Sequence, residues 1–211
     1  MFSKHVWYDR QHQAEVFITD EGEISGTIVA YQGAVCVINP RPEILLALYQ
    51  EAKIKRILSI RSIILTDNSI AFTRGLCAFV NYCRGLRRRT PLTIVTHTDS
   101  RISNDFLRSS CARLWSDCAF DLEYAHLTTG EIYGLGRGNI RFTRPPRGNE
   151  GSRPYLVMTT DKNRSLHYYD ESYDAAVDDS HADEEKPNVV IRAGELPGYL
   201  KSVRQRLVVG G

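Results

Sequence analysis

The histidines are the first side chains to consider for proton transfer or metal binding. They are His5, His12, His97, His126, His167 and His181, and no pair has His-x-His or i, i+4 spacing. His97 ends a β-rich run, and ligands bind at such strand ends in α/β sheets. His97 is therefore a candidate proton-transfer residue, and the competing interpretation is a hydrogen-bonded loop histidine.

The cysteines do not have the spacing of a zinc site. They are Cys36, Cys77, Cys83, Cys111 and Cys118, and none belongs to a CxxC pair. Residues 1–10 contain no apolar segment, so we expect no secretory signal and a reducing, cytoplasmic location. Because free cysteine is among the most buried residue types, we interpret these thiols as core residues.

Two groups of arginines stand near aromatic residues, a combination that suits phosphate binding and base stacking. The candidate phosphate or partner contacts are Arg84, Arg87, Arg88, Arg89, Arg141, Arg144 and Arg147. A solvated basic surface is the simpler interpretation. Alternatively, these arginines meet the acidic loop 170–187, within the chain or in a neighbouring subunit. The candidate partners are thus a protein, a second copy, a nucleotide or a nucleic acid.

Other short motifs favour structure over chemistry. The glycine-rich run Gly134–Gly138 does not lie between a strand and a helix, so we interpret it as a hairpin turn rather than a phosphate loop. No GxSxG segment is present to hold a hydrolase serine. We interpret the terminal Gly210-Gly211 as a frayed end.

Length and composition indicate an ordinary globular protein. The sequence has 211 residues, 42% of them hydrophobic, and a formal net charge of +2. This size suits one domain with a sizeable core, and the charge does not by itself favour nucleic acid. No apolar run reaches the length of a membrane span, so we expect no membrane association.

Alternating strands and helices position these side chains. Strand patterns occupy 16–19, 27–30, 34–38, 61–66 and 92–96, and helical patterns occupy 43–55, 70–83 and 103–115. From residue 120 onward the pattern is mainly β, with strand-like runs at 120–124, 132–133, 139–142, 155–158, 166–169 and 188–191. The sequence therefore predicts an α/β fold.

Residues 62–76 resemble the signature segment of the metallo-β-lactamase fold family. That segment is a strand, a Thr, His-x-His-x-Asp-His, two residues and Gly-Leu at a helix; here a hydrophobic strand, Thr66 and Gly75-Leu76 stand in the same frame. Val35–Asn39 is similar to the family's preceding strand and Asp-x-Gly turn. The resemblance implies a single domain over residues 1–211, a four-layer αββα sandwich with the acidic loop 170–187 and a basic C-terminal tail.

The family's metal ligands do not carry over to this sequence. The degenerate ligand positions are Asn39, Asp67, Ser69, Ala71 and Phe72. Asp170 matches the family's metal-bridging Asp. Thr66-Asp67 and Ile70 give some likeness to the pyrroloquinoline-quinone synthesis protein B branch, which keeps the Asp-His that is Ala71-Phe72 here. Because Ala and Phe offer no lone pair, the resemblance implies a pseudoenzyme that acts as a binding or assembly module, with no zinc or other cofactor.

The alternative is a divergent metal-dependent hydrolase, phosphodiesterase or nuclease of the same fold. Its catalytic residues would be Asp67, His97 and Asp170, and Asp67, Ser69 and Asp170 would hold a hard ion such as Mg²⁺. The simpler interpretation of Asp67 is a helix cap. A further hypothesis is an assembly subunit that pairs with a homologue through its arginines.

Overall fold

The chain folds into two compact units, Met1–His126 and Leu127–Gly211. The computed structural model describes residues 3–8, 12–18, 24–31, 33–50, 54–66, 70–97, 116, 118–143, 155–159, 165–169, 189–193 and 206–209. The helix predicted at 103–115 lies outside these residues. Among the described helices, none has the length and apolar character needed to cross a membrane.

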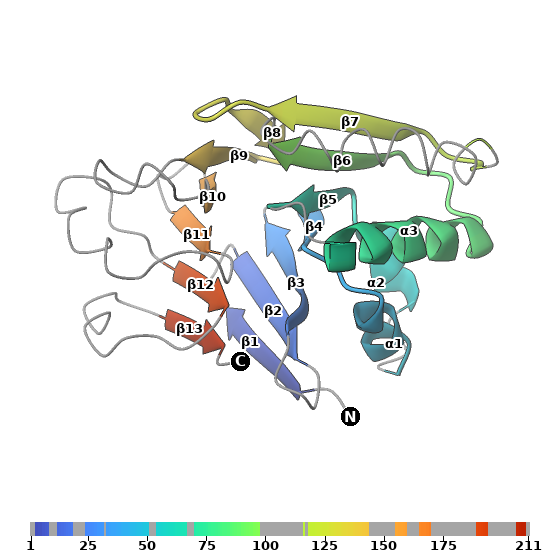
Figure 1. Cartoon of the computed structure of the whole chain (residues 1–211), viewed down its shortest axis with the longest axis horizontal. Coiled ribbons are helices and arrows are strands. Elements are labelled where there is room, and N and C mark those ends of the chain that lie inside the picture. Colours follow the sequence, from blue (N-terminus) through green and yellow to red (C-terminus); the bar gives the residue numbers. More distant parts are fainter. Residues whose placement is uncertain are drawn as a thin grey trace, which may run out of the picture. The chain divides into compact units, whose positions relative to one another are not determined.

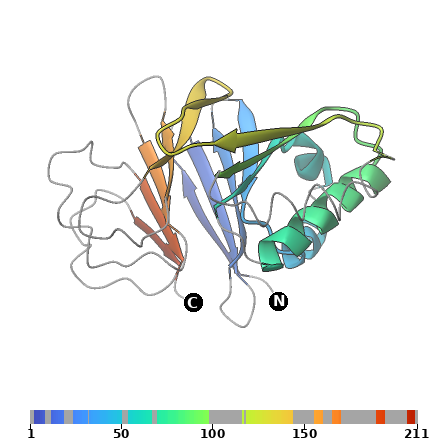
Figure 2. The ribbon, with the colours of Figure 1, turned by 45° about the horizontal axis from the view of Figure 1, so that its top comes forward.

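The first unit is a sheet with three helices on one face (Figures 1 and 2). Its strands are β1 (Ser3–Tyr8), β2 (His12–Ile18), β3 (Ile24–Tyr31), β4 (Ala34–Ile38), β5 (Ser62–Leu65), β6 (Leu92–His97) and β7 (Leu122–Leu127), in that spatial order. The helices are α1 (Glu43–Gln50), α2 (Ile54–Ser59) and α3 (Ile70–Gly85). β1 to β4 pair antiparallel, whereas β4, β5 and β6 are parallel.

A row of apolar residues crosses the sheet beneath the helices. The register aligns Ile28 with Val37, Val37 with Ile63, and Ile63 with Ile94, and all four are fully buried. They share one core with residues of all three helices, among them Ile44, Leu48, Ile57, Leu76 and Phe79. Each such side chain contributes about 1.5–3 kcal/mol on burial, so this core is the main stabilising element of the first unit.

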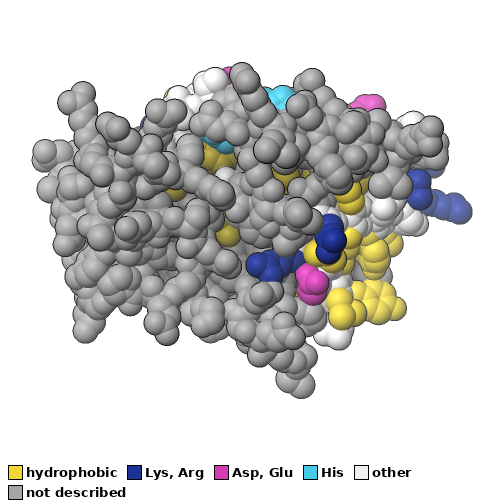
Figure 3. Space-filling model, in the orientation of Figure 1, with side chains coloured by type: hydrophobic (Ala, Val, Ile, Leu, Met, Phe, Trp, Pro, Cys, Tyr) yellow, Lys and Arg dark blue, Asp and Glu magenta, His cyan; other side chains and the backbone are white. Residues whose placement is uncertain are grey.

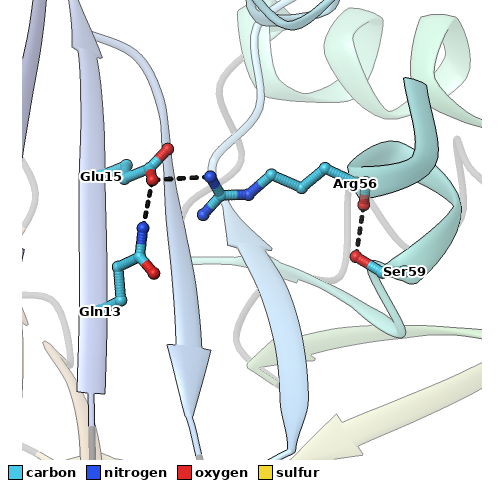
Figure 4. A network of polar contacts seen from close by, with 4 residues as sticks. All are labelled: Gln13, Glu15, Arg56 and Ser59. Atoms are coloured by element: carbon cyan, nitrogen blue, oxygen red, sulfur yellow. Dashed lines mark hydrogen bonds and ion pairs between the residues drawn. The ribbon is translucent and has the colours of Figure 1, made fainter. Parts of the chain in front are cut away.

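One charged residue interrupts that row. Glu15 of β2 lies in register with Ile28, and its side chain is 2% exposed. Arg56 of α2 reaches it with a distance of 2.6 Å between Arg56 Nη1 and Glu15 Oε1, and Gln13 donates to the same oxygen (Figure 4). A buried carboxylate needs such a partner because an uncompensated buried charge costs several kcal/mol.

The second unit contains a six-stranded sheet. Its strands are β8 (Tyr133–Leu135), β9 (Gly138–Thr143), β10 (Tyr155–Thr159), β11 (Ser165–Tyr169), β12 (Val189–Ala193) and β13 (Arg206–Val209), and their spatial order follows the chain. β8 to β11 pair antiparallel and β11 to β13 pair parallel. The glycine-rich run forms the β8–β9 hairpin with Gly136 at φ 64°, which confirms the predicted turn.

Two expectations differ from the structure. The single helix predicted at 43–55 is wrong, because α1 and α2 are separate helices and α2 continues to Ser59. Ile57 of α2 and Ile60 just after it are buried. The charged residues Lys55 and Arg56 interrupt the apolar pattern that would have indicated this second helix. The basic C-terminal tail contains β13, which pairs with β12.

Gly75 of α3 allows the helix to lie directly against the turn after β4. A Cβ at this position would lie 1.7 Å from the Pro40 carbonyl oxygen and 2.8 Å from Arg41 Cα. Both atoms belong to the main chain, so neither can rotate out of the way. Gly75 is therefore required by a close backbone approach, which explains one residue of the family-like segment in physical terms.

We expect Gly75→Ala to destabilise the protein by at least about 1–3 kcal/mol, because the added methyl group must displace main chain. Gly85→Ala is the matched control, since no atom lies within 4 Å of a Cβ placed at Gly85, at the end of the same helix. Urea unfolding of the three proteins measures the difference. Equal midpoints for Gly75→Ala and the wild type would contradict the close approach.

Candidate functional site: the edge where the parallel strands end

The carboxyl ends of β4, β5 and β6 meet at one edge of the first sheet. Asn39 follows β4, Thr66 follows β5, and Thr96 and His97 end β6. Parallel strands place these residues side by side, at the position where open α/β sheets bind ligands. All four side chains are at least 95% buried. This edge is the candidate functional site.

Asn39 joins the first two strand ends. Its Nδ2 donates to Thr66 Oγ1 at 2.7 Å, and its Oδ1 accepts the Thr66 backbone N–H at 2.9 Å. Its own backbone N–H donates to the Ile64 carbonyl at 2.9 Å. Asn39 has a φ of 46°, a left-handed conformation that Asn tolerates better than most residues. The amide thus fixes where β5 ends and where the following segment begins.

The family-like segment continues from Thr66 into α3. Asp67 and Ser69 lie outside the described residues, as does Asp170. Ala71 and Phe72 lie in the first turn of α3, which begins at Ile70, although their side chains are not described. The strand, the Thr and the helix carrying Gly75 therefore occur where the sequence resemblance predicts them.

His126 of β7 is a site residue that the sequence reasoning missed. Its Nδ1 lies 2.8 Å from Thr96 Oγ1, and its ring stacks on Tyr124 with 6.1 Å between centroids and 17° between planes. Thr93 and Glu123, three residues earlier on the same two strands, also contact each other. Tyr124 and His126 are two residues apart on β7 and therefore share a face, and that alternation was the available signal. His97, the sequence candidate, is 3% exposed.

Arg88, one of the candidate phosphate or partner contacts, is buried and bonded to the chain's own carbonyls. It is 2% exposed, and its guanidinium donates to the carbonyls of Leu58, Thr90 and Pro91 at 3.1, 2.8 and 2.7 Å. Its Cζ also lies 5.8 Å from the centroid of the Phe120 ring. Arg88 therefore holds together the segments on which these carbonyls lie.

The remaining arginines of that cluster are exposed. Arg84, Arg87 and Arg89 lie at the C-terminal end of α3, which precedes the start of β6. Because α3 connects two parallel strands, its C-terminal end lies at the edge of the sheet opposite the candidate site. Figure 3 shows Lys and Arg side chains where α3 ends. Arg141 of β9 is half-buried, while Arg144 and Arg147 lie outside the described residues.

Two of the cysteines are core residues, as the sequence predicts. Cys36 and Cys83 are fully buried, and burial raises the pKa of the Cys36 thiol to about 12 and that of Cys83 to about 11. Cys77 and Cys118 are partly exposed, and Cys111 lies outside the described residues. Within the described part of the chain, no group of three or more His, Cys, Asp or Glu side chains is placed to hold a metal ion.

Solved structures share this architecture at low sequence identity. The metallo-β-lactamase fold protein YhfI from Bacillus subtilis is 14% identical with a TM-score of 0.58, over 85% of this chain and 66% of that one. Human tRNase Z, short form, is 11% identical with a TM-score of 0.60, over 83% and 72%. The apo chemotaxis sensor ODP from T. denticola is 11% identical with a TM-score of 0.53, over 90% and 69%.

These structures show that the chain has the metallo-β-lactamase fold, which confirms the fold that the residues around Thr66 and Gly75 predict. The chain spans slightly less than two thirds of YhfI. No protein-family model and no curated protein matches the sequence.

We expect Asn39→Gly to lower the free energy of unfolding by about 1–3 kcal/mol, because the variant leaves buried polar groups of Thr66 without their partner. Glycine tolerates a φ of 46°, so the loss measures the amide rather than backbone strain. The control is Asn139→Ala, which removes an exposed asparagine of β9 without placing glycine inside a strand. We expect this variant to change the free energy of unfolding by no more than about 0.5 kcal/mol. Chemical denaturation gives both values; an unchanged Asn39→Gly variant would rule out the clamp.

The raised thiol pKa values predict a loss of stability at high pH. An unfolded thiol has a pKa of 9.0, whereas folded Cys36 titrates at about 12. Above pH 9 the unfolded state releases protons that the folded state retains, so stability falls as pH rises, by up to about 1.4 kcal/mol per pH unit for one thiol. Cys36→Ala should flatten the decline between pH 9 and 10.5, as measured by urea unfolding. A slope identical to the wild type would contradict the assignment.

Proposed function

We propose that this chain is a metallo-β-lactamase-fold protein without hydrolytic metal chemistry, which binds a partner at the edge where β4, β5 and β6 end. The observation that carries the proposal is the pair Ala71-Phe72 in the family's Asp-His frame. A catalytic zinc typically takes three protein ligands and keeps one position open for water. Neither Ala nor Phe supplies an electron pair, so a hydrolytic site would lack two adjacent ligands.

The fixed surroundings of the segment support its alignment with the family. Thr66 is held by Asn39 on one side of it, and Gly75 lies against Pro40 on the other. Both anchors depend on main-chain atoms, so a shift of one residue would break a hydrogen bond and create a clash. This double anchoring favours assigning Ala71 and Phe72 to the ligand positions.

A binding role suits the polar groups of this edge. Asn39 and Thr66 are hydrogen-bonded to each other, and Thr96 to His126, so their geometry is set before any ligand arrives. Preorganised polar groups on rigid strands can fix the orientation of a bound molecule. Among the structurally similar proteins, ODP is described as a chemotaxis sensor.

The exposed arginines support a second contact surface for assembly. Arg84, Arg87 and Arg89 lie at the edge of the sheet opposite the candidate site, so a partner bound through them leaves that site free. Size-exclusion chromatography with light scattering at low and high salt tests this role, because salt screens surface charge. If the measured mass of the assembly is the same at low and high salt, charge pairing through these residues is excluded.

The alternative is a divergent hydrolase that uses Asp67, His97 and Asp170. Two observations favour it: His97 is buried at the candidate site, and one solved relative is a tRNase Z. Carboxylates alone would favour a hard ion such as Mg²⁺ over zinc. In this case the activity depends on Asp67 and Asp170, whereas a binding module has no such activity to lose.

We expect the purified protein to hold less than stoichiometric zinc by elemental analysis and to lack phosphodiesterase activity toward bis(p-nitrophenyl) phosphate, with or without added Mg²⁺. A protein of known zinc content serves as the positive control for the elemental analysis. One or more tightly held zinc ions per chain, together with activity, would refute the proposal.

Variants test whether any activity depends on the two aspartates. If activity is found, Asp67→Ala and Asp170→Ala must abolish it while far-UV circular dichroism is unchanged, which would establish the hydrolase. Asp121→Ala is the matched control, since Asp121 is exposed and lies before β7. Activity that survives both aspartate changes would exclude Asp67 and Asp170 as its catalytic residues.

A further inference from the structure

The second sheet has one face whose described polar side chains include two unpartnered donors. Along β9, Ile140 and Phe142 are buried and point to one side, whereas Asn139, Arg141 and Thr143 alternate with them and point to the other. Arg141 Nε and Thr143 Oγ1 are both buried, and neither has a hydrogen-bond partner within the described structure. Two such atoms on neighbouring positions of one face call for a common explanation.

The group that would satisfy Arg141 must be a hydrogen-bond acceptor, because arginine only donates. A guanidinium stays charged at any physiological pH and only donates hydrogen bonds, and a threonine hydroxyl can donate as well. The Cα atoms of residues two apart on a strand are separated by about 6.6 Å, a gap that one small oxyanion can bridge between two side chains. Arg141 as a whole residue is only half-buried, although its Nε is enclosed.

The described residues of the neighbouring strands place no negative charge on this face. Thr143 is in register with Tyr155, Arg141 with Val157, and Val157 with His167. The rings of Tyr155 and His167 lie 5.5 Å apart. The same register continues through Val190 to Arg206 of β13. Among the described positions of this face on β9, β10 and β11 there is no Asp or Glu, so no acidic side chain there competes for Arg141.

We propose that Arg141 and Thr143 form an anion site that binds a phosphate group, either free or carried by a larger ligand. Arginine with hydroxyl donors suits a tetrahedral oxyanion, which offers several acceptors at once. The site lies within the second unit and is independent of the function proposed for the strand ends of the first.

Thermal unfolding of the full chain in a phosphate titration at constant ionic strength tests the site, with potassium chloride as the compensating salt. We expect the melting temperature to rise with phosphate in the wild type, because a ligand that binds only the folded state stabilises it. Arg141→Gln should abolish the rise, and Thr143→Val should weaken it. Arg137→Gln, an exposed arginine in the β8–β9 turn, should keep it. AMP in place of phosphate identifies the source: a larger rise with AMP assigns a nucleotide phosphate, and an equal rise assigns free phosphate.

Three results would overturn the proposal. The first is no phosphate-dependent rise in the wild type. The second is an equal rise in Arg141→Gln, which would show that the effect is not local. The third concerns Thr143→Val without phosphate. Since the hydroxyl has no hydrogen-bond partner among the described residues, removing it should leave the melting temperature unchanged or higher. A clear decrease would show that the hydroxyl was already satisfied. Far-UV circular dichroism confirms that each variant is folded.

Discussion

No side chain fits between Gly75 and the main chain of Pro40, and this contact fixes how α3 meets the turn after β4. The same turn lies close to Gly26 of β3, where a Cβ would stand 3.3 Å from Pro40 Cα and 2.7 Å from Ile44 Cδ1. Asn39, the preceding residue, holds the end of β5. β3, the end of β5 and α3 therefore all meet at the turn that follows β4.

Asparagine suits this turn for reasons of both backbone and side chain. The turn requires a positive φ, and the neighbouring Thr66 presents one donor and one hydroxyl oxygen. A primary amide supplies one acceptor and one donor without a charge, so all of these groups are satisfied in a buried place. The departure from the family's Asp at this position is thus compatible with an intact scaffold, whatever the chemistry of the site.

The elements predicted correctly are those whose own residues, without distant partners, specify a strand or a helix. β4 was predicted with its observed bounds, because an apolar run between Gly33 and Asn39-Pro40 leaves little choice. α3 and β6 were predicted to within two residues. β1 and β13 were missed because their strand character depends on partners distant in sequence or, for β1, on a hairpin with a polar strand.

The site was less predictable than the fold. His126 takes its role from Thr96, thirty residues away, and Arg88 takes its role from three carbonyls that become neighbours only after folding. Four arginines lie close together at 84 and 87–89, and nothing in the sequence indicates that Arg88 is the buried one. Asn39 and Gly75, in contrast, were found because the family-like frame assigns each a position. Why those residue types are needed follows only from the structure, from the Asn39–Thr66 hydrogen bonds and from the close approach of Gly75 to Pro40.

The ion pair between Glu15 and Arg56 has a consequence for how the first unit opens. α2 is short, so its own hydrogen bonds give it little independent stability. If α2 detached by itself, it would leave the Glu15 carboxylate without a counter-charge in an apolar layer, and that penalty opposes the partial opening. Local fluctuations of α2 are thereby tied to those of β2, and the amide protons of the two elements should become accessible to solvent in the same cooperative event.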